Sequence, residues 1–256
     1  MALPVTRTAS CLLIAAGLAA LGGCQILDPD RGVMRDRSVA PITEPKEDAA
    51  VRPAKPIADA PLTEPLNVVV QNGFGSVVIR ENPDEDRPQV KVRRMDDAAA
   101  KGPSDGFTAV LTDGTLNIDC PDQGGPVNVE IVVHSLANVT VRNSGGIVSI
   151  LNASGSIDVT NGTAERAGDA ITVNTRHQLS SAISLGTDRG PVTLSMPSGS
   201  TGLLNVRGQP MRVNVYARNE NLSQVRLGEG TYSAVANGGS AEMRISAPGP
   251  VTVTFR

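Results

Sequence analysis

Residues Val139–Glu165 read VTVRNSGGI, VSILNASGS and IDVTNGTAE, which are three consecutive units of nine residues. Apolar residues stand at the first and third positions of each unit, and asparagine stands at the fifth. The positions that define this structural repeat are Val139, Val141, Asn143, Val148, Ile150, Asn152, Ile157, Val159 and Asn161. Glycine holds the eighth position of the first two units, as Gly146 and Gly155. A motif this regular constrains the path of the backbone.

The spacing within the units predicts short β-strands separated by turns. Apolar residues two apart lie on one face of a strand. Because nine is an odd number, equivalent residues of successive units would point to opposite faces of an uninterrupted strand. The chain must therefore turn between units, and asparagine and glycine tolerate the backbone of tight turns. We predict an all-β fold, a β-helix or β-solenoid whose inward valines and isoleucines form one continuous core.

Looser copies of the unit extend this prediction over residues 66–256. Val68 and Val77 are nine residues apart, as are Ile183 and Val192, and insertions interrupt the spacing near 160–170 and 215–237. The coils are expected to end at Phe255, in an exposed last coil that risks pairing with another molecule. The repeat asparagines are interpreted as turn formers, with an amide ladder along the coils as the alternative. An antiparallel meander of hairpins is the alternative fold, since Asn-Gly and Asp-Gly turns also join hairpins. One such hairpin is predicted at 107–118.

Composition agrees with a narrow β-core and argues against one class of partner. Of 256 residues, 2% are aromatic and none is tryptophan, which suits thin coils packed with branched aliphatic side chains. The net charge is −3, with no long run of one sign. Nothing in this distribution marks a nucleic-acid footprint, so no nucleic-acid partner is expected.

The N-terminal sequence predicts localisation in the bacterial cell envelope. Arg7 precedes an apolar stretch at 11–20 that is too short to span a membrane, as in a signal peptide. Leu21-Gly22-Gly23-Cys24 then resembles the lipobox of bacterial lipoproteins. The resemblance implies a lipoprotein signal peptide at 1–23, cleavage between Gly23 and Cys24, and lipidation of Cys24.

Several acyl chains anchor a protein stably where a single chain binds only marginally. We therefore expect the lipid bilayer as a partner through acylated Cys24, with the outer membrane favoured because Gln25 follows the cysteine, and with the domain facing the periplasm or the surface. Residues 24–65 are polar and rich in proline, which predicts a disordered tether between the anchor and the β-domain.

The residues that often carry chemistry form no recognisable catalytic or metal-binding motif. Cys120 has no partnering base nearby in the sequence, and His134 and His177 lack the spacing of metal ligands. The acidic stretch 81–86 is interpreted as a solvated loop rather than a calcium site, because its spacing is irregular. We therefore predict no catalytic residue, no metal site and no cofactor.

Residues 66–256 resemble a known bacterial family, the auto-transporter adhesin head (GIN-type) domains and related adhesin-like domains of unknown function. The segments that carry the resemblance are Val68–Ile79, Asp113–Ile118, Gly146–Ile150, Gly155–Val159 and Val192–Pro197. The family implies a β-helix-like fold and a role in the cell envelope, with no catalytic residues to carry over. We expect a non-enzymatic, adhesin-like module that binds an envelope protein or a polysaccharide. An envelope sensor subunit and a polysaccharide-active β-helix enzyme are the alternatives.

Overall fold

Each nine-residue unit becomes one β-strand and one turn in the computed structural model, which describes residues 64–94, 106–122 and 125–256. The three tandem units form β7 (Leu136–Asn143), β8 (Gly146–Leu151) and β9 (Ile157–Asn161). The chain reverses after each strand, so β7 and β9 enter one sheet and β8 enters another. Within their sheet β7 and β9 pair in parallel, with Val139 opposite Ile157. One coil therefore takes two units, and the predicted coiled all-β fold is confirmed.

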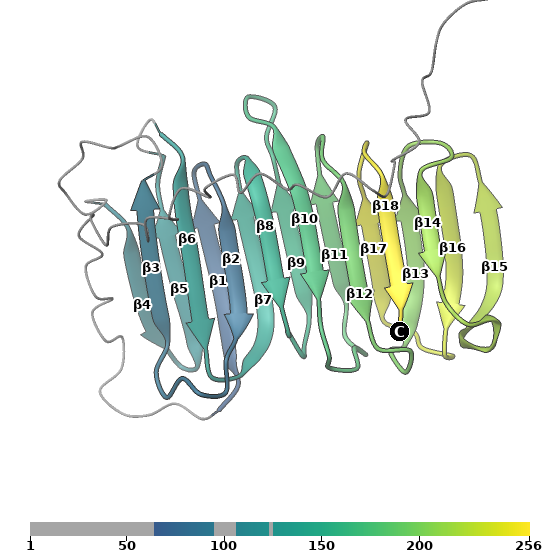
Figure 1. Ribbon diagram of the computed structural model, residues 1–256, viewed down its shortest axis with the longest axis horizontal. Helices are drawn as coiled ribbons and strands as arrows, with labels where there is room; N and C mark the ends of the chain where they lie inside the picture. Colours follow the sequence, from purple (N-terminus) through teal and green to yellow (C-terminus); the bar gives the residue numbers. More distant parts are fainter. Residues whose placement is uncertain (1–63, 95–105, 123–124) are drawn as a thin grey trace, which may run out of the picture. The chain divides into compact units, whose positions relative to one another are not determined.

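Two sheets of such strands face each other across the core, and Figure 1 shows the strands side by side along the stack. The larger sheet, called sheet A, contains in spatial order β15 (Leu222–Gly228), β16 (Thr231–Ala236), β13 (Gly202–Arg207), β17 (Glu242–Ser246), β11 (Ile183–Thr187), β9, β7, β1 (Leu66–Asn72), β5 (Thr115–Cys120) and β4 (Thr108–Thr112). The smaller one, sheet B, contains β14 (Val213–Tyr216), β18 (Val251–Phe255), β12 (Val192–Met196), β10 (Gly168–Asn174), β8, β2 (Val77–Glu81), β6 (Val127–Val133) and β3 (Gln89–Arg94).

The coils are not stacked in the order of the sequence. Each coil joins one strand of sheet A to the next strand of sheet B, and their spatial order is β5–β6, β1–β2, β7–β8, β9–β10, β11–β12, β17–β18 and β13–β14. The prediction of an exposed last coil is wrong, because β18 lies between β12 and β14 and Phe255 is buried. Intercalation satisfies the backbone N–H and C=O groups on both edges of the terminal strands.

Antiparallel strands are confined to the two ends of the stack. At one end β3 pairs with β6, and β4 forms the predicted hairpin with β5. Its turn residues Asp113 and Gly114 have φ of 47° and 69°, as a type I′ turn requires. At the other end β16 pairs with β13, and β15 pairs with β16. Among the described residues antiparallel strands thus cover the ends of a parallel stack, and the meander alternative is excluded for the coils between them.

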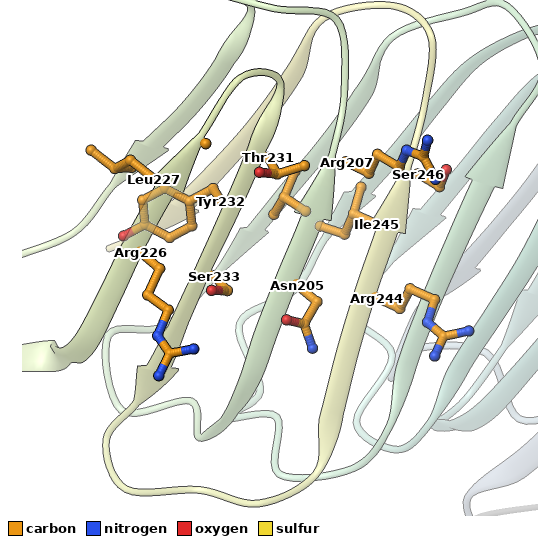
Figure 2. Close-up of a pocket in the computed structure, with 12 residues that line it drawn as sticks. Asn205, Arg207, Arg226, Leu227, Thr231, Tyr232, Ser233, Arg244, Ile245 and Ser246 are labelled. Atoms are coloured by element: carbon orange, nitrogen blue, oxygen red, sulfur yellow. The ribbon is translucent and has the colours of Figure 1, made fainter.

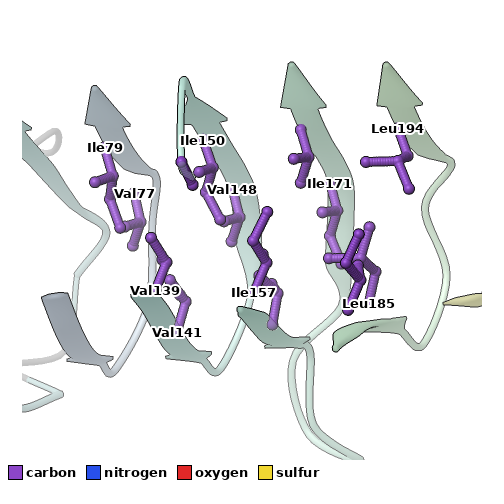
Figure 3. Packing of buried hydrophobic residues seen from close by; sticks show 14 of the residues in the cluster. Val77, Ile79, Val139, Val141, Val148, Ile150, Ile157, Ile171, Leu185 and Leu194 are labelled. Carbon is purple, nitrogen blue, oxygen red and sulfur yellow. The ribbon is translucent and has the colours of Figure 1, made fainter. Parts of the chain in front are cut away.

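Alternate residues of the facing strands fill the space between the sheets. The six apolar positions of the tandem repeat are at most 1% exposed: Val139, Val141, Val148, Ile150, Ile157 and Val159. In Figure 3 side chains from sheet B, such as Ile79 and Ile150, point toward those from sheet A, such as Val141. Burying each such side chain contributes about 1.5–3 kcal/mol. The core is therefore a continuous column of small branched residues, as the repeat predicts.

Glycines stand where the chain crosses from sheet A to sheet B and successive coils come closest together. Gly75 and Gly146 have φ of 124° and 99°, a region that side chains with a Cβ rarely enter. A Cβ on Gly146 would also lie 2.2 Å from the carbonyl oxygen of Gly75 in the neighbouring coil. The corner therefore requires glycine both for its backbone conformation and for the distance between coils.

Candidate functional site

The asparagines of the repeat form a hydrogen-bonded ladder inside sheet A, which corrects their interpretation as turn formers alone. Asn143 donates from Nδ2 to Oδ1 of Asn161 at 2.8 Å, and Asn72 donates in the same way to Asn143 at 2.8 Å. All three side chains are buried. Parallel in-register pairing brings identical amides together in adjacent coils, as in cross-β stacks.

The ladder ends where the residue type changes. Cys120 occupies the position next to Asn72 on β5, and Thr187 occupies the position next to Asn161 on β11. Asn152, the asparagine of the middle repeat unit, belongs to sheet B and does not join the ladder. Its φ is 65°, so it forms a left-handed turn as the sequence predicts. Asparagines at one repeat position therefore have two structural roles.

The Cys120 thiol belongs to the core rather than to a reactive site. Burial, together with the charge of Asp119, raises its pKa to about 12. The nucleophilic form of cysteine is the thiolate, which such a pKa makes scarce at neutral pH.

Glu81 is not part of a solvated loop, which corrects the interpretation of the acidic stretch 81–86. It ends β2, and its side chain is only 5% exposed. Arg176 Nη2 lies 3.0 Å from one carboxylate oxygen, and His177 Nε2 lies 3.2 Å from both. The backbone N–H of Leu136 donates to the carboxylate at 3.3 Å. Glu81 thus joins the end of β2 to the start of β7 and to the turn after β10.

Burial of the Glu81 carboxyl acts to raise its pKa, but the hydrogen bonds from Arg176, His177 and Leu136 and the charge of His177 outweigh that effect. The net result is a pKa below the usual range of a glutamate. The carboxylate is therefore ionised at neutral pH, and this cluster is a structural tie between coils.

The outer face of sheet A is one of the two sheet faces that point away from the core. Its outward side chains are mainly short and polar, and parallel pairing sets them in rows across the strands. One row across six strands contains Asp158, Ser184, Arg244, Asn205, Ser233 and Arg226. Arginines near the middle of both sheets are paired with carboxylates, Arg142 with Asp158 in sheet A and Arg80 with Glu130 in sheet B.

A shallow groove of about 580 Å³ lies at the end of sheet A formed by β13, β15, β16 and β17. Figure 2 shows Arg226 and Arg244 at opposite sides of a row with Ser233 and Asn205 between them, and Arg207 in the row beside it. Three arginines and no carboxylate line this groove. Arg244 is 2.8 Å from Glu242, which lies outside the lining. The side chains of Arg207 and Arg226 have no ion pair or side-chain hydrogen bond with another described residue.

Sequence reasoning did not find this groove. Arg207, Arg226 and Arg244 are dispersed in the sequence, and only the strand order of sheet A brings them together. A signal was present in the alternation of β13 and β17. Arg207 is the exposed residue after buried Val206, and Arg244 is the exposed residue between buried Met243 and Ile245.

The predicted lipidation site Cys24, the cleavage site after Gly23, the signal peptide 1–23 and most of the tether 24–65 lie outside the described residues. Within the part that the structure describes, no helix has the length and apolar composition needed to cross a bilayer. The same residues bring together no group of three or more His, Cys, Asp or Glu side chains that could hold a metal ion.

Comparison with known proteins identifies the fold. No family model matches the chain, and no curated protein sequence matches it. The crystal structure of a "putative cell adhesion protein" from Clostridium sporogenes matches with a TM-score of 0.50 and 14% sequence identity, over 75% of this chain and 92% of that chain. A "putative adhesin" from Bacteroides fragilis matches over 76% of this chain and 94% of that chain at 12% identity, with a TM-score of 0.27 that is too low to bear on the fold. The chain therefore shares its β-fold with the first of these proteins.

Proposed function

We propose that the chain is a lipid-anchored lipoprotein of the bacterial cell envelope whose β-solenoid, residues 66–256, is a non-enzymatic, adhesin-like binding module. The outer face of sheet A is the observation that carries the proposal. It is a broad surface of short polar side chains in register, with an arginine-lined groove at one end. Solenoid faces of this kind suit extended partners.

Three further observations support this function. The fold is shared with a protein from Clostridium sporogenes that is described as a "putative cell adhesion protein". Two of the segments that resemble adhesin head (GIN-type) domains, Gly146–Ile150 and Gly155–Val159, lie within the tandem repeat that builds the central coils. An adhesive role needs a firm anchor, and the lipobox ending at Cys24 supplies one.

The anchor and the adhesive role are tested separately. Cells grown with a radiolabelled fatty acid should label the chain, and Cys24→Ser should abolish the labelling and release the chain from the membrane fraction. Deleting the gene should reduce attachment of cells to polysaccharide-coated or cell surfaces, and the wild-type gene should restore it. Unchanged attachment in the deletion strain would count against the adhesive role even if lipidation is found.

A further inference from the structure

Arg207 and Arg226, two of the three arginines of the groove, differ from Arg142 and Arg80 on the outer sheet faces. Arg142 and Arg80 each have a carboxylate partner on the adjacent strand. Arg207 and Arg226 are exposed and have no such partner among the described residues, although the chain as a whole has a net charge of −3. Unpaired guanidinium groups in a concave surface attract anions, and their planar donors match a carboxylate in two parallel hydrogen bonds.

The spacing of the charges indicates a ligand with widely separated anions. Arg226 and Arg244 lie in one row, three strands apart, which corresponds to about 14 Å between their backbones. Ser233 and Asn205 lie between them and offer neutral hydrogen-bonding groups. Hydroxyl groups of a sugar chain are suited to those positions.

Nucleic acids fit this groove less well. Their phosphates follow one another far more closely, with one charge per about 3.4 Å along each strand of a duplex. Proteins that hold single strands also rely on aromatic side chains for stacking. Tyr232 is the one aromatic residue lining the groove, and its side chain is partly buried against the core.

We propose that the groove formed by β13, β15, β16 and β17 binds an acidic polysaccharide, with Arg207, Arg226 and Arg244 contacting its carboxylates and Asn205 and Ser233 its hydroxyls. This inference rests on the proposed function, because it names the site and the ligand class of the adhesive face. A carboxylate that binds Arg244 replaces or supplements the local contact with Glu242.

The test measures binding of the full chain to immobilised polygalacturonate, with uncharged dextran and a single-stranded thymidine oligonucleotide as comparison probes. We expect binding to polygalacturonate that weakens with salt, and none to dextran. Arg207→Gln combined with Arg226→Gln should raise the Kd about tenfold or more, since two charge-assisted contacts are lost. Arg142→Gln is the matched control, because it removes an arginine from the same face outside the groove, and its Kd should match the wild type.

Several results would overturn the inference. Equal losses of affinity in Arg142→Gln and in the double variant would indicate that polygalacturonate is attracted by positive charge anywhere on the outer face of sheet A, and not by the groove. Tighter binding of the oligonucleotide, lost in the double variant, would assign the groove to nucleic acid. A double variant that aggregates but binds polygalacturonate normally would mean that the arginines protect the β15 edge from pairing. If the double variant does not fold, the single variants carry the test, and an unchanged Kd in both refutes the site.

The deletion strain separates this inference from the proposed function. Expression of the double variant in the deletion strain should leave attachment of the cells impaired. Full restoration by the double variant, in a strain whose deletion reduces attachment, would refute the groove and leave the adhesive role standing. A deletion without any effect on attachment would refute the adhesive role, whatever the purified chain binds.

Discussion

The fifth position of the repeat shows how one residue type is used in two ways. Asn143 lies at the end of a sheet A strand, where its amide meets those of Asn72 and Asn161 inside the stack. Asn152 lies at the end of a sheet B strand, where its backbone turns with φ of 65°. Buried amides need partners, and the ladder gives them partners from the neighbouring coils.

Asn143→Ala should destabilise the fold by about 2–4 kcal/mol, because it removes the middle rung and leaves the buried Asn72 Nδ2 donor and the buried Asn161 Oδ1 acceptor without their ladder partners. Equilibrium urea unfolding of the variant and the wild type measures the difference. Asn152→Gly is the matched control, since glycine tolerates the same turn, and it should change the stability by less than about 1 kcal/mol. Equal losses in the two variants would contradict a special role for the ladder.

The lowered pKa of Glu81 predicts that the stability of the fold depends on pH. Its pKa in the folded chain is lowered, so the carboxylate stabilises the fold above the unfolded-state pKa of about 4.3. That contribution is lost as the pH falls through the lower, folded-state pKa. Glu81→Gln should therefore cost about 1–2 kcal/mol at pH 7, and the difference from wild type should shrink in acid below pH 4.3.

Urea unfolding at a series of pH values tests this expectation. Asp86→Asn, which removes an exposed carboxylate from the adjoining loop, is the control and should change stability by less than about 0.5 kcal/mol at every pH. A difference between Glu81→Gln and wild type that stays constant down to pH 3 would show that the tie to Arg176 and His177 does not depend on the ionised carboxylate.

At the scale of the element, the sequence predicted where the strands lie along the chain better than which strands are neighbours in the sheets. Val139, Val148 and Ile157 could be assigned to strands because their spacing is local and the turn residues between them are explicit. The same spacing placed Val68 and Val77 in successive copies of the unit, which the structure contains as β1 and β2. Local periodicity was enough for these assignments.

The order of the strands could not be predicted in this way, because any aliphatic strand of the repeat type can pair with any other. Nothing in β17 or β18 marks them for a place between the β11–β12 and β13–β14 coils. For the same reason, the groove that depends on β13 and β17 being neighbours was missed. Glu81 was misinterpreted because its partners, Arg176 and His177, are distant in the sequence.

The intercalated position of β18 predicts slow hydrogen exchange at the C-terminus. Chain ends usually fray, but both neighbours of β18 pair with it in parallel along most of its length. Amide protons of Val251–Phe255 should therefore be protected about as strongly as those of β10, while those of the edge strand β15 exchange sooner. Exchange followed by mass spectrometry with peptide resolution measures this. Rapid exchange at 251–255 would contradict the strand order.

At the scale of the whole described domain, the coil order places the first and the last coil of the domain in sequence inside the stack. In ordinary solenoids each repeat contacts only its neighbours in sequence, so removing the last repeat removes only an end. Here β1 lies between β5 and β7, and β17 lies between β11 and β13. The terminal coils close gaps that the rest of the chain leaves open.

Truncation after Ala241, which removes β17 and β18, should therefore abolish cooperative folding rather than shorten the stack. It deletes the partners of β11 and β13 in sheet A and of β12 and β14 in sheet B. Ile245 and Val253, both fully buried, leave the core with these strands. Losing several such side chains at about 1.5–3 kcal/mol each exceeds the stability of a typical domain when the lost backbone pairing is added.

Circular dichroism during urea unfolding distinguishes the outcomes. We expect one sharp transition for the full chain, and for the truncated chain either no transition or a broad one with aggregation, since β11, β12, β13 and β14 then present unpaired edges. A truncated chain that remains soluble and unfolds in one sharp transition at slightly lower urea would mean that β17 and β18 are a dispensable end coil, contrary to the strand order. Addition of residues 242–256 as a separate peptide should restore part of the lost β signal, because the peptide supplies the strands that pair with β11 and β13 and with β12 and β14.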